Sequence, residues 1–205
     1  MGRTTTGGER NAWRLPGRRL PPARPLFRIL RERDRELSRH SEGVARLAVA
    51  TGRRFFFCEA EIDTLREAGC LHDIGKLAIP RSILDKPSPL DEEEWRVMRR
   101  HPAIGAEMLL ERSGMKATAR LVRSAHERFD GTGYPDGLAG EEIPLGSRVI
   151  FAADAYDAMV SARPYRPAMT PAEAIAEMRR YSRSQFDPVV VELLCDVLEH
   201  ESAVV

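Results

Sequence analysis

From residue 26 onward, apolar residues recur at the three- to four-residue spacing that predicts amphipathic helices. The first such stretch reaches Gly52, and a second runs from Glu59 to Cys70 and stops by Pro80. Further helical stretches are expected over residues 91–100, 102–112, 116–127 and 146–161, and after residues 170 and 187. We therefore predict an all-α domain over residues 26–205.

Two capping boxes mark expected helix starts. Asp91 is followed three residues later by Glu94, and Thr170 is followed at the same spacing by Glu173. Strand signals are few, because the apolar run at 55–57 is too short and has charged residues on both sides. The pattern thus favours helices throughout the domain.

Composition narrows the class of protein. The chain has 205 residues, of which 42% are apolar and 31% charged, which suits one globular domain. A net charge of +1 gives no case for a nucleic acid polymer or an anionic membrane as partner. No apolar run approaches the roughly 18 residues of a membrane span. Residues 1–25, rich in arginine, proline and glycine, are expected to be a disordered tail.

The three cysteines are far apart and form no CxxC pair. They suggest neither a disulfide framework nor a zinc finger, and a reducing cytoplasm is the simplest location. Histidine is also sparse, with five residues in the chain. Four of them lie beside carboxylates, glycines or a lysine, a setting typical of a metal-dependent hydrolase. These four are His40, His72, His101 and His126.

The string LHDIGK at 71–76 places an imidazole and a carboxylate side by side. Neighbours on a helix point about 100° apart, so His72 and Asp73 can both face one groove, and a carboxylate can bridge two metals. Lys76 lies one turn later on the same face and can hold a phosphate oxygen. Gly75 allows another backbone or a substrate to come close. A surface ion pair is the plainer interpretation of the His-Asp pair alone.

Two further pairs occupy predicted helices. Glu36 and His40 are spaced i, i+4 on one face, and Asp154 and Asp157 lie in an otherwise apolar helix. A buried carboxylate needs a partner, so we expect a metal at Asp154 and a structural hydrogen bond at Asp157. Exposed polar side chains are the plainer interpretation of Glu36 and His40, and they are the alternative for Asp154 and Asp157.

The other two of the four candidate histidines lie at predicted helix boundaries. His101 precedes Pro102 at a predicted helix start, where a capping or loop role is the alternative. His126 precedes a glycine- and proline-rich loop that is suited to form a pocket wall. The HExxH metalloprotease motif is rejected, because Asp130 stands where its second histidine belongs.

Taken together, these side chains offer mixed nitrogen and oxygen ligation. Such ligands suit iron or manganese better than zinc. A pair of metals bridged by a carboxylate generates hydroxide at neutral pH and clamps phosphoryl oxygens. The residues alone therefore predict hydrolysis of a phosphate ester.

Several strings also resemble one family in their order and spacing. The chain is similar to the HD-GYP family, a subgroup of the HD-domain phosphohydrolases, over about residues 28–198. The strings are LHDIGKLAIPRSIL, KPSPLDEEEW, HPAIGAEML, HERFDGTGYPDGLAGEEIPLGSRVI, ADAYDAMVSARPYR and FDP. The resemblance implies an HD-domain helical bundle with two or three divalent ions, iron or manganese, in its core. It implies hydrolysis of cyclic di-GMP to pGpG or GMP.

The resemblance also implies roles for individual residues. One ion would be held by His40, His72, Asp73 and Asp154, and a second by His101 and His126, with Asp73 bridging. Glu36 matches the position that recruits a third ion. Asp73 and Lys76 would be the catalytic residues, with Lys76 at the scissile phosphate or the bridging hydroxide. Substrate contacts would come from Lys76, Lys86, Gly133, Tyr134, Pro135 and Arg148.

One position departs from the family pattern. The family has two consecutive histidine ligands where this chain has Ala125 and His126. Three functions therefore stay open: an active phosphodiesterase acting on cyclic di-GMP, an impaired module that binds nucleotide or a protein partner, and a hydrolase of another cyclic dinucleotide. Signalling partner proteins and a homodimer are further expectations.

Overall fold

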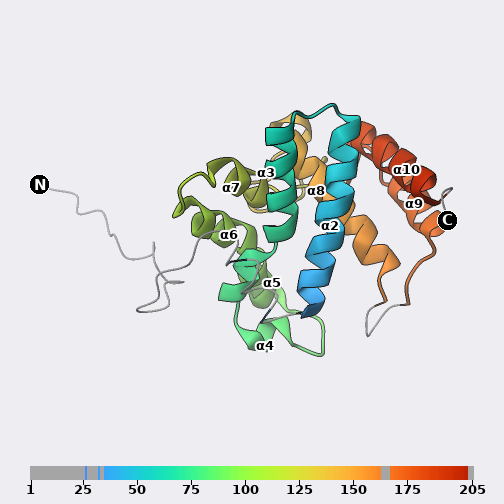
Figure 1. The fold of residues 1–205 in the computed structure, drawn as a ribbon. Coiled ribbons are helices and arrows are strands. Elements are labelled where there is room, and N and C mark those ends of the chain that lie inside the picture. The colour runs from blue at the N-terminus through green and yellow to red at the C-terminus, as the bar shows by residue number, and fades with distance from the viewer. Residues whose placement is uncertain (1–25, 27–31, 33–34, 163–166, 203–205) are drawn as a thin grey trace, which may run out of the picture.

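The computed structural model describes residues 26, 32, 35–162 and 167–202, and within these ranges the chain forms helices joined by loops, with no strand (Figure 1). The predicted all-α class is therefore confirmed. The predictions for the tail over residues 1–25 and for most of residues 27–34 lie outside the described residues.

Two long helices near the N-terminal end of the described chain position the candidate ligands His40 and His72. Helix α2 covers Arg35–Arg54 and α3 covers Glu59–Leu71, so α2 continues two residues beyond the predicted end at Gly52. The two helices lie side by side in close contact (Figure 1). They approach so closely that a Cβ added at Gly69 would lie 2.8 Å from the Cα of Ala45.

Short helices follow α3 and lead to α6. The 3-10 helix η1 covers Ile74–Ala78, α4 covers Arg81–Leu84, α5 covers Glu92–Met98 and α6 covers His101–Leu110. The first capping box is confirmed, because the Glu94 backbone N–H donates to Asp91 Oδ1 over 2.9 Å. Helix α4 was not predicted, since four residues are too few to show a period.

The second half of the chain completes the bundle. Helix α7 covers Lys116–Arg123, η2 covers Gly140–Glu142, α8 covers Leu145–Val160, α9 covers Pro171–Arg180 and α10 covers Pro188–Ser202. The second capping box is confirmed, because the Glu173 N–H donates to Thr170 Oγ1 over 3.2 Å.

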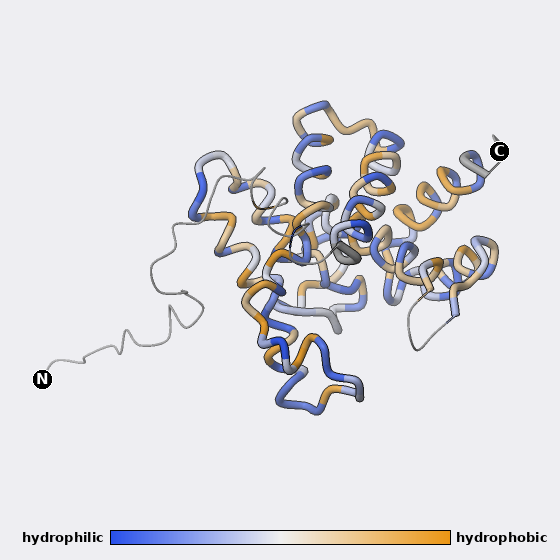
Figure 2. Tube along the Cα trace, turned by 60° about the horizontal axis from the view of Figure 1, so that its bottom comes forward, coloured by the Kyte–Doolittle hydropathy of each residue, from blue (hydrophilic) through white to orange (hydrophobic). Residues whose placement is uncertain are grey.

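Helix α8 lies at the centre of the packing and contacts α2, α3, α7, α9 and α10. Apolar and polar positions alternate around most helices, and the apolar ones build a shared core (Figure 2). Ala152 and Ala153 of α8 are fully buried, and their small side chains let neighbouring helices come close. Among the described helices, none combines the length and the apolar character needed to cross a membrane.

Candidate metal centre

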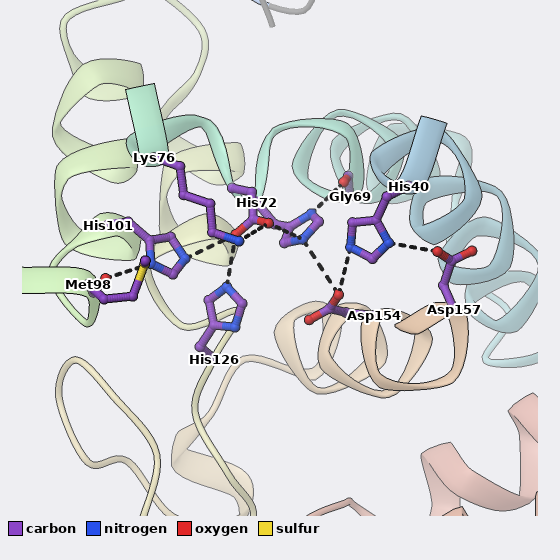
Figure 3. A network of polar contacts seen from close by, with 10 residues as sticks. His40, Gly69, His72, Lys76, Met98, His101, His126, Asp154 and Asp157 are labelled. Atoms are coloured by element: carbon purple, nitrogen blue, oxygen red, sulfur yellow. Dashed lines mark hydrogen bonds and ion pairs between the residues drawn. The ribbon is translucent and has the colours of Figure 1, made fainter. Parts of the chain in front are cut away.

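Four imidazoles from separate segments of the chain converge on two carboxylates (Figure 3). The segments are α2, the end of α3, the first residue of α6 and the turn after α7. The imidazoles are those of His40, His72, His101 and His126, and the carboxylates are those of Asp73 and Asp154. Residues far apart in the sequence thus meet as the metal-site hypothesis requires.

Asp73 lies between two groups of candidate ligand atoms. Its Oδ1 is 3.1 Å from His101 Nε2 and 3.5 Å from His126 Nε2. Its Oδ2 is 3.5 Å from His72 Nε2. Each group brings its ligand atoms within 4.8 Å of one another, and Asp73 belongs to both groups. One carboxylate can therefore reach two cation positions.

The second carboxylate completes the group around His40 and His72. Asp154 Oδ1 lies 2.9 Å from His40 Nε2 and 3.8 Å from His72 Nε2. Asp154 projects from α8, whereas His40 projects from α2, so the packing of these two helices brings the atoms together.

Backbone carbonyls fix the tautomer of two of the imidazoles. His72 Nδ1 donates to the Gly69 carbonyl and His101 Nδ1 donates to the Met98 carbonyl, each over 2.8 Å. A carbonyl only accepts, so Nδ1 carries the proton in both rings and a neutral ring has a bare lone pair on Nε2. These lone pairs face the oxygens of Asp73, which are also acceptors. Two acceptors facing each other in a buried site repel one another, so this arrangement favours a cation between them.

The buried atoms of the site support the same conclusion. His72 Nε2, His101 Nε2, His126 Nε2 and Asp73 Oδ1 are buried and make no hydrogen bond within the described part of the chain. A buried polar atom without a partner costs about 1–3 kcal/mol. Four such atoms in one cluster fit divalent metal ions, which would use each of them as a ligand.

A carboxylate outside the ligand cluster orients His40. His40 Nδ1 lies 2.6 Å from Asp157 Oδ2, which leaves Nε2 directed at Asp154. Burial alone would lower the pKa of His40, but hydrogen bonds to Asp154 and Asp157 raise it to about 9. The predicted structural hydrogen bond of Asp157 is confirmed, and this arrangement matches the carboxylate–histidine–metal triads of metalloproteins.

The electrostatics keep both carboxylates charged. Burial alone would raise the pKa of Asp73, but the positive charge of Lys76, followed by the nearby imidazoles of His72, His101 and His126, holds it well below its usual range. Burial is likewise outweighed at Asp154, whose pKa is lowered by its hydrogen bond from His40. Burial lowers the pKa of His126 and thereby favours its neutral, metal-binding form.

A cavity of about 1000 Å³ opens onto this cluster. Lys76 lines it and donates to Asp73 Oδ2 over 2.6 Å, with its side chain 28% exposed. Tyr134 also lines it and stacks on His126, with ring centroids 5.4 Å apart and planes 7° apart. The centre is thus accessible from one side, where a cation and an aromatic ring flank it.

Glu127 organises the loop that carries Tyr134, a role that sequence reasoning missed. Its Oε1 accepts from the backbone N–H groups of Asp136 and Gly137 over 2.7 and 3.1 Å. A Cβ at Gly133 would lie 2.3 Å from the Arg128 nitrogen, so the loop folds back tightly on the Glu127 segment. The available signal was an acidic residue between a candidate ligand and a glycine-rich loop.

Two predicted phosphate contacts are engaged in ion pairs within the protein. Lys86 pairs with Glu94 of the α5 capping box, and Arg148 pairs with Asp187 and donates to the Ile143 carbonyl over 3.0 Å. Neither side chain lines the cavity. Each cation is held by a carboxylate that the fold brings to it, and the substrate roles of Lys86 and Arg148 stay predictions.

The remaining predicted residues fall into three cases. Gly133 and Pro135 belong to the loop but do not line the cavity, whereas Tyr134 does. The side chain of Glu36 lies outside the described part of the structure. Ala125 is fully buried and belongs to the hydrophobic core, directly before His126.

Comparisons with known proteins show the family of the chain. The chain matches the HD domain family over residues 25–190. It is 41% identical over 171 residues to the cyclic di-GMP phosphodiesterase response regulator RpfG of Xanthomonas campestris, with 82% of this chain and 45% of the relative covered. It is 44% identical over 149 residues to the 3'3'-cGAMP-specific phosphodiesterase 3 of Vibrio cholerae, with coverages of 73% and 32%.

Among solved structures, Bd1817, a HDG"Y"P protein from Bdellovibrio bacteriovorus, superimposes with a TM-score of 0.64 at 20% identity. The match covers 81% of this chain and 53% of that one, and it supports the fold alone. The chain spans less than half the length of the curated relatives named above.

Proposed function

The chain belongs to the HD-GYP group of the HD-domain family, and from this premise we propose that it is a metal-dependent phosphodiesterase that hydrolyses cyclic di-GMP to pGpG or GMP. The observation that carries the proposal is the convergence of four imidazoles and Asp73 on two adjoining cation positions beside an open cavity. Relatives named as cyclic di-GMP phosphodiesterases support the choice of substrate.

The proposed ligands divide around Asp73. His40, His72 and Asp154 would hold one ion and His101 and His126 would hold the other, and Asp73 would contribute to both. We propose iron or manganese, because the ligand set mixes imidazole nitrogen with carboxylate oxygen. A third ion at Glu36 remains part of the proposal. Bound divalent ions supply an activated water at neutral pH and positive charge beside the phosphoryl oxygens.

The chain's own residues position the substrate. Asp73 stays ionised at neutral pH, since the positive charge of Lys76 offsets its burial and holds its pKa well below the usual range. Lys76 reaches the cavity with its ammonium group, so it would hold a non-bridging oxygen of the scissile phosphate. Tyr134 packs flat on His126 and thereby restricts the orientation of that ligand.

A second candidate function follows from Ala125. A methyl group cannot bind a metal, so the second position would have one imidazole fewer than in the family pattern. The chain would then be an impaired module that binds a nucleotide or a protein partner without turnover. A related outcome is hydrolysis of another cyclic dinucleotide, such as the 3'3'-cGAMP named for a Vibrio relative.

Metal content and turnover distinguish these functions. Protein purified without oxygen should hold about two ions per chain and should cleave cyclic di-GMP with iron or manganese. Fewer than about two ions per chain together with no cleavage in either metal would contradict the proposal and favour the binding module. Cleavage of 3'3'-cGAMP in preference to cyclic di-GMP would replace the substrate.

Restoring the missing imidazole gives a sharper test. We expect Ala125→His to raise both metal occupancy and the rate of hydrolysis. Ala125→Leu is the matched control, because it adds similar bulk to the core without a ligand nitrogen. If Ala125→His changes neither quantity, position 125 does not adjoin the second ion.

We also propose that the protein acts in the cytoplasm, as expected for an enzyme of a second messenger, and that it works with signalling partner proteins or as a homodimer. The cavity and ligand cluster described above come from one chain. Sedimentation of the purified protein would test the dimer directly.

A further inference from the structure

The cavity beside the candidate metal centre is lined by both charged and apolar groups. The imidazoles of His40, His101 and His126 line it, together with Lys76, Asp157 and charged residues such as Arg39, Arg81 and Asp85. The apolar lining residues come from η1 and the residue after it, α4, the loop before α5, and α5 itself, and we call them the apolar side. The apolar side chains are those of Leu77, Ile79, Leu84, Leu90, Trp95 and Met98. An occupant of this cavity therefore combines an anionic group with a flat or apolar one.

Trp95 is the most unusual residue of the apolar side. Its side chain is 44% exposed, although a tryptophan in a folded domain is normally highly buried. The other large apolar side chains that are exposed in the described ranges, such as Phe56 and Leu110, do not line this cavity. The exposed part of the Trp95 indole is therefore available for contact with a ligand in the cavity.

The surrounding contacts hold Trp95 in a fixed position relative to the metal centre. Trp95 lies in α5, whose first turn is fixed by the Asp91–Glu94 capping box. The Met98 carbonyl, one turn after Trp95, accepts from His101 Nδ1 over 2.8 Å (Figure 3). The helix that presents the indole therefore also orients a proposed metal ligand, so the two are positioned together.

Arg99 occupies part of the indole surface. Its guanidinium carbon lies 5.8 Å from the centre of the Trp95 ring, within the range of a cation–π contact. Arg99 itself does not line the cavity. Trp95 itself lines the cavity and stays 44% exposed beside this contact.

We propose that Trp95 is a stacking platform for one nucleobase of the substrate, with the scissile phosphate at Asp73 and Lys76. This inference rests on the proposed function, because it assigns the second half of the same cavity. A purine offers an apolar face of the same kind as indole, and base–aromatic stacking tolerates different bases. Trp95 thus contributes affinity for cyclic dinucleotides without discriminating guanine from adenine.

Kinetics test the platform. We expect Trp95→Ala to raise KM for cyclic di-GMP by roughly five- to 150-fold, the range that stacking of one base is worth, and to change kcat by less than about twofold. Trp95→Phe should retain part of the affinity because it keeps an aromatic face. Phe56→Ala is the matched control, since it removes an exposed aromatic ring outside the cavity and should leave KM unchanged.

Fluorescence gives a readout that does not depend on turnover. The chain has two tryptophans, so a Trp13→Phe variant reports on Trp95 alone. Cyclic di-GMP should change its emission saturably, whereas inorganic phosphate should not. Calorimetry on the same variant measures whether the dinucleotide binds.

The outcomes separate the two proposals. Binding with a change in emission but no hydrolysis supports the platform and contradicts the phosphodiesterase. Hydrolysis with an unchanged KM in Trp95→Ala, or calorimetric binding without a change in emission, overturns the platform and leaves the phosphodiesterase standing. Absence of both binding and hydrolysis in the parent protein overturns both.

Discussion

Gly75 marks the closest approach between the segment of Asp73 and helix α6. A Cβ added at Gly75 would lie 1.9 Å from the His101 carbonyl oxygen and 2.7 Å from the Gly105 nitrogen. Both atoms belong to the backbone, so no side-chain rotation can relieve the overlap. Gly75→Ala must therefore move η1 and α6 apart.

The size of this movement follows from the contact distance. Real Cβ atoms keep at least about 3 Å from other heavy atoms, so the two backbones must separate by about 1 Å. Overpacking of this kind costs about 1–3 kcal/mol in the free energy of unfolding. The same movement separates His101 Nε2 from Asp73 Oδ1, now 3.1 Å apart. A displacement of 1 Å in a catalytic constellation costs about 100-fold in rate.

Three measurements check this prediction: metal content per chain, the rate of cyclic di-GMP hydrolysis, and the urea midpoint of unfolding. Leu194→Ala is the control for stability, because Leu194 is fully buried in α10 and does not line the cavity. That control should lose about 2–5 kcal/mol yet keep its rate per folded molecule. The reasoning is wrong if Gly75→Ala keeps normal metal content and rate, or if Leu194→Ala loses rate equally.

Two further predictions concern a positioning residue and the thiols. Asp157→Asn should weaken metal binding at the His40 position by about 10- to 100-fold, because it removes the carboxylate that orients the ring. Titration of the metal against a chelator measures this affinity, and an unchanged affinity would contradict the orienting role of Asp157. At pH 7.5, Ellman's reagent should modify only the exposed Cys58 of the native protein, because burial raises the pKa of the Cys70 and Cys195 thiols to about 11. Rapid reaction of all three thiols would refute the predicted protection of Cys70 and Cys195.

Local signals in the sequence were sufficient to predict most helix starts. The Asp91–Glu94 and Thr170–Glu173 pairs each form the expected cap, because a capping box depends only on residues three positions apart. Helix α4 was missed because its four residues present no period. Such short segments are fixed by the packing around them.

Residues of the candidate site could be predicted where an ionisable side chain stands in an otherwise apolar stretch of sequence. A carboxylate in an otherwise apolar helix, such as Asp154, indicated a partner that the structure supplies. Lys86 and Arg148 could not be judged in this way, because their carboxylate partners are set by tertiary packing. Trp95 was missed for the same reason. Tertiary packing decides whether a helical residue lines a cavity, and the spacing of apolar residues does not show it.

The central claim is that one carboxylate, Asp73, serves two metal positions. Elemental analysis of Asp73→Ala, compared with the parent protein and checked for fold by circular dichroism, tests it most directly. We predict that the folded variant loses both ions, because Asp73 adjoins the ligands of both positions. Retention of the full metal content by folded Asp73→Ala would contradict the shared carboxylate and the mechanism built on it.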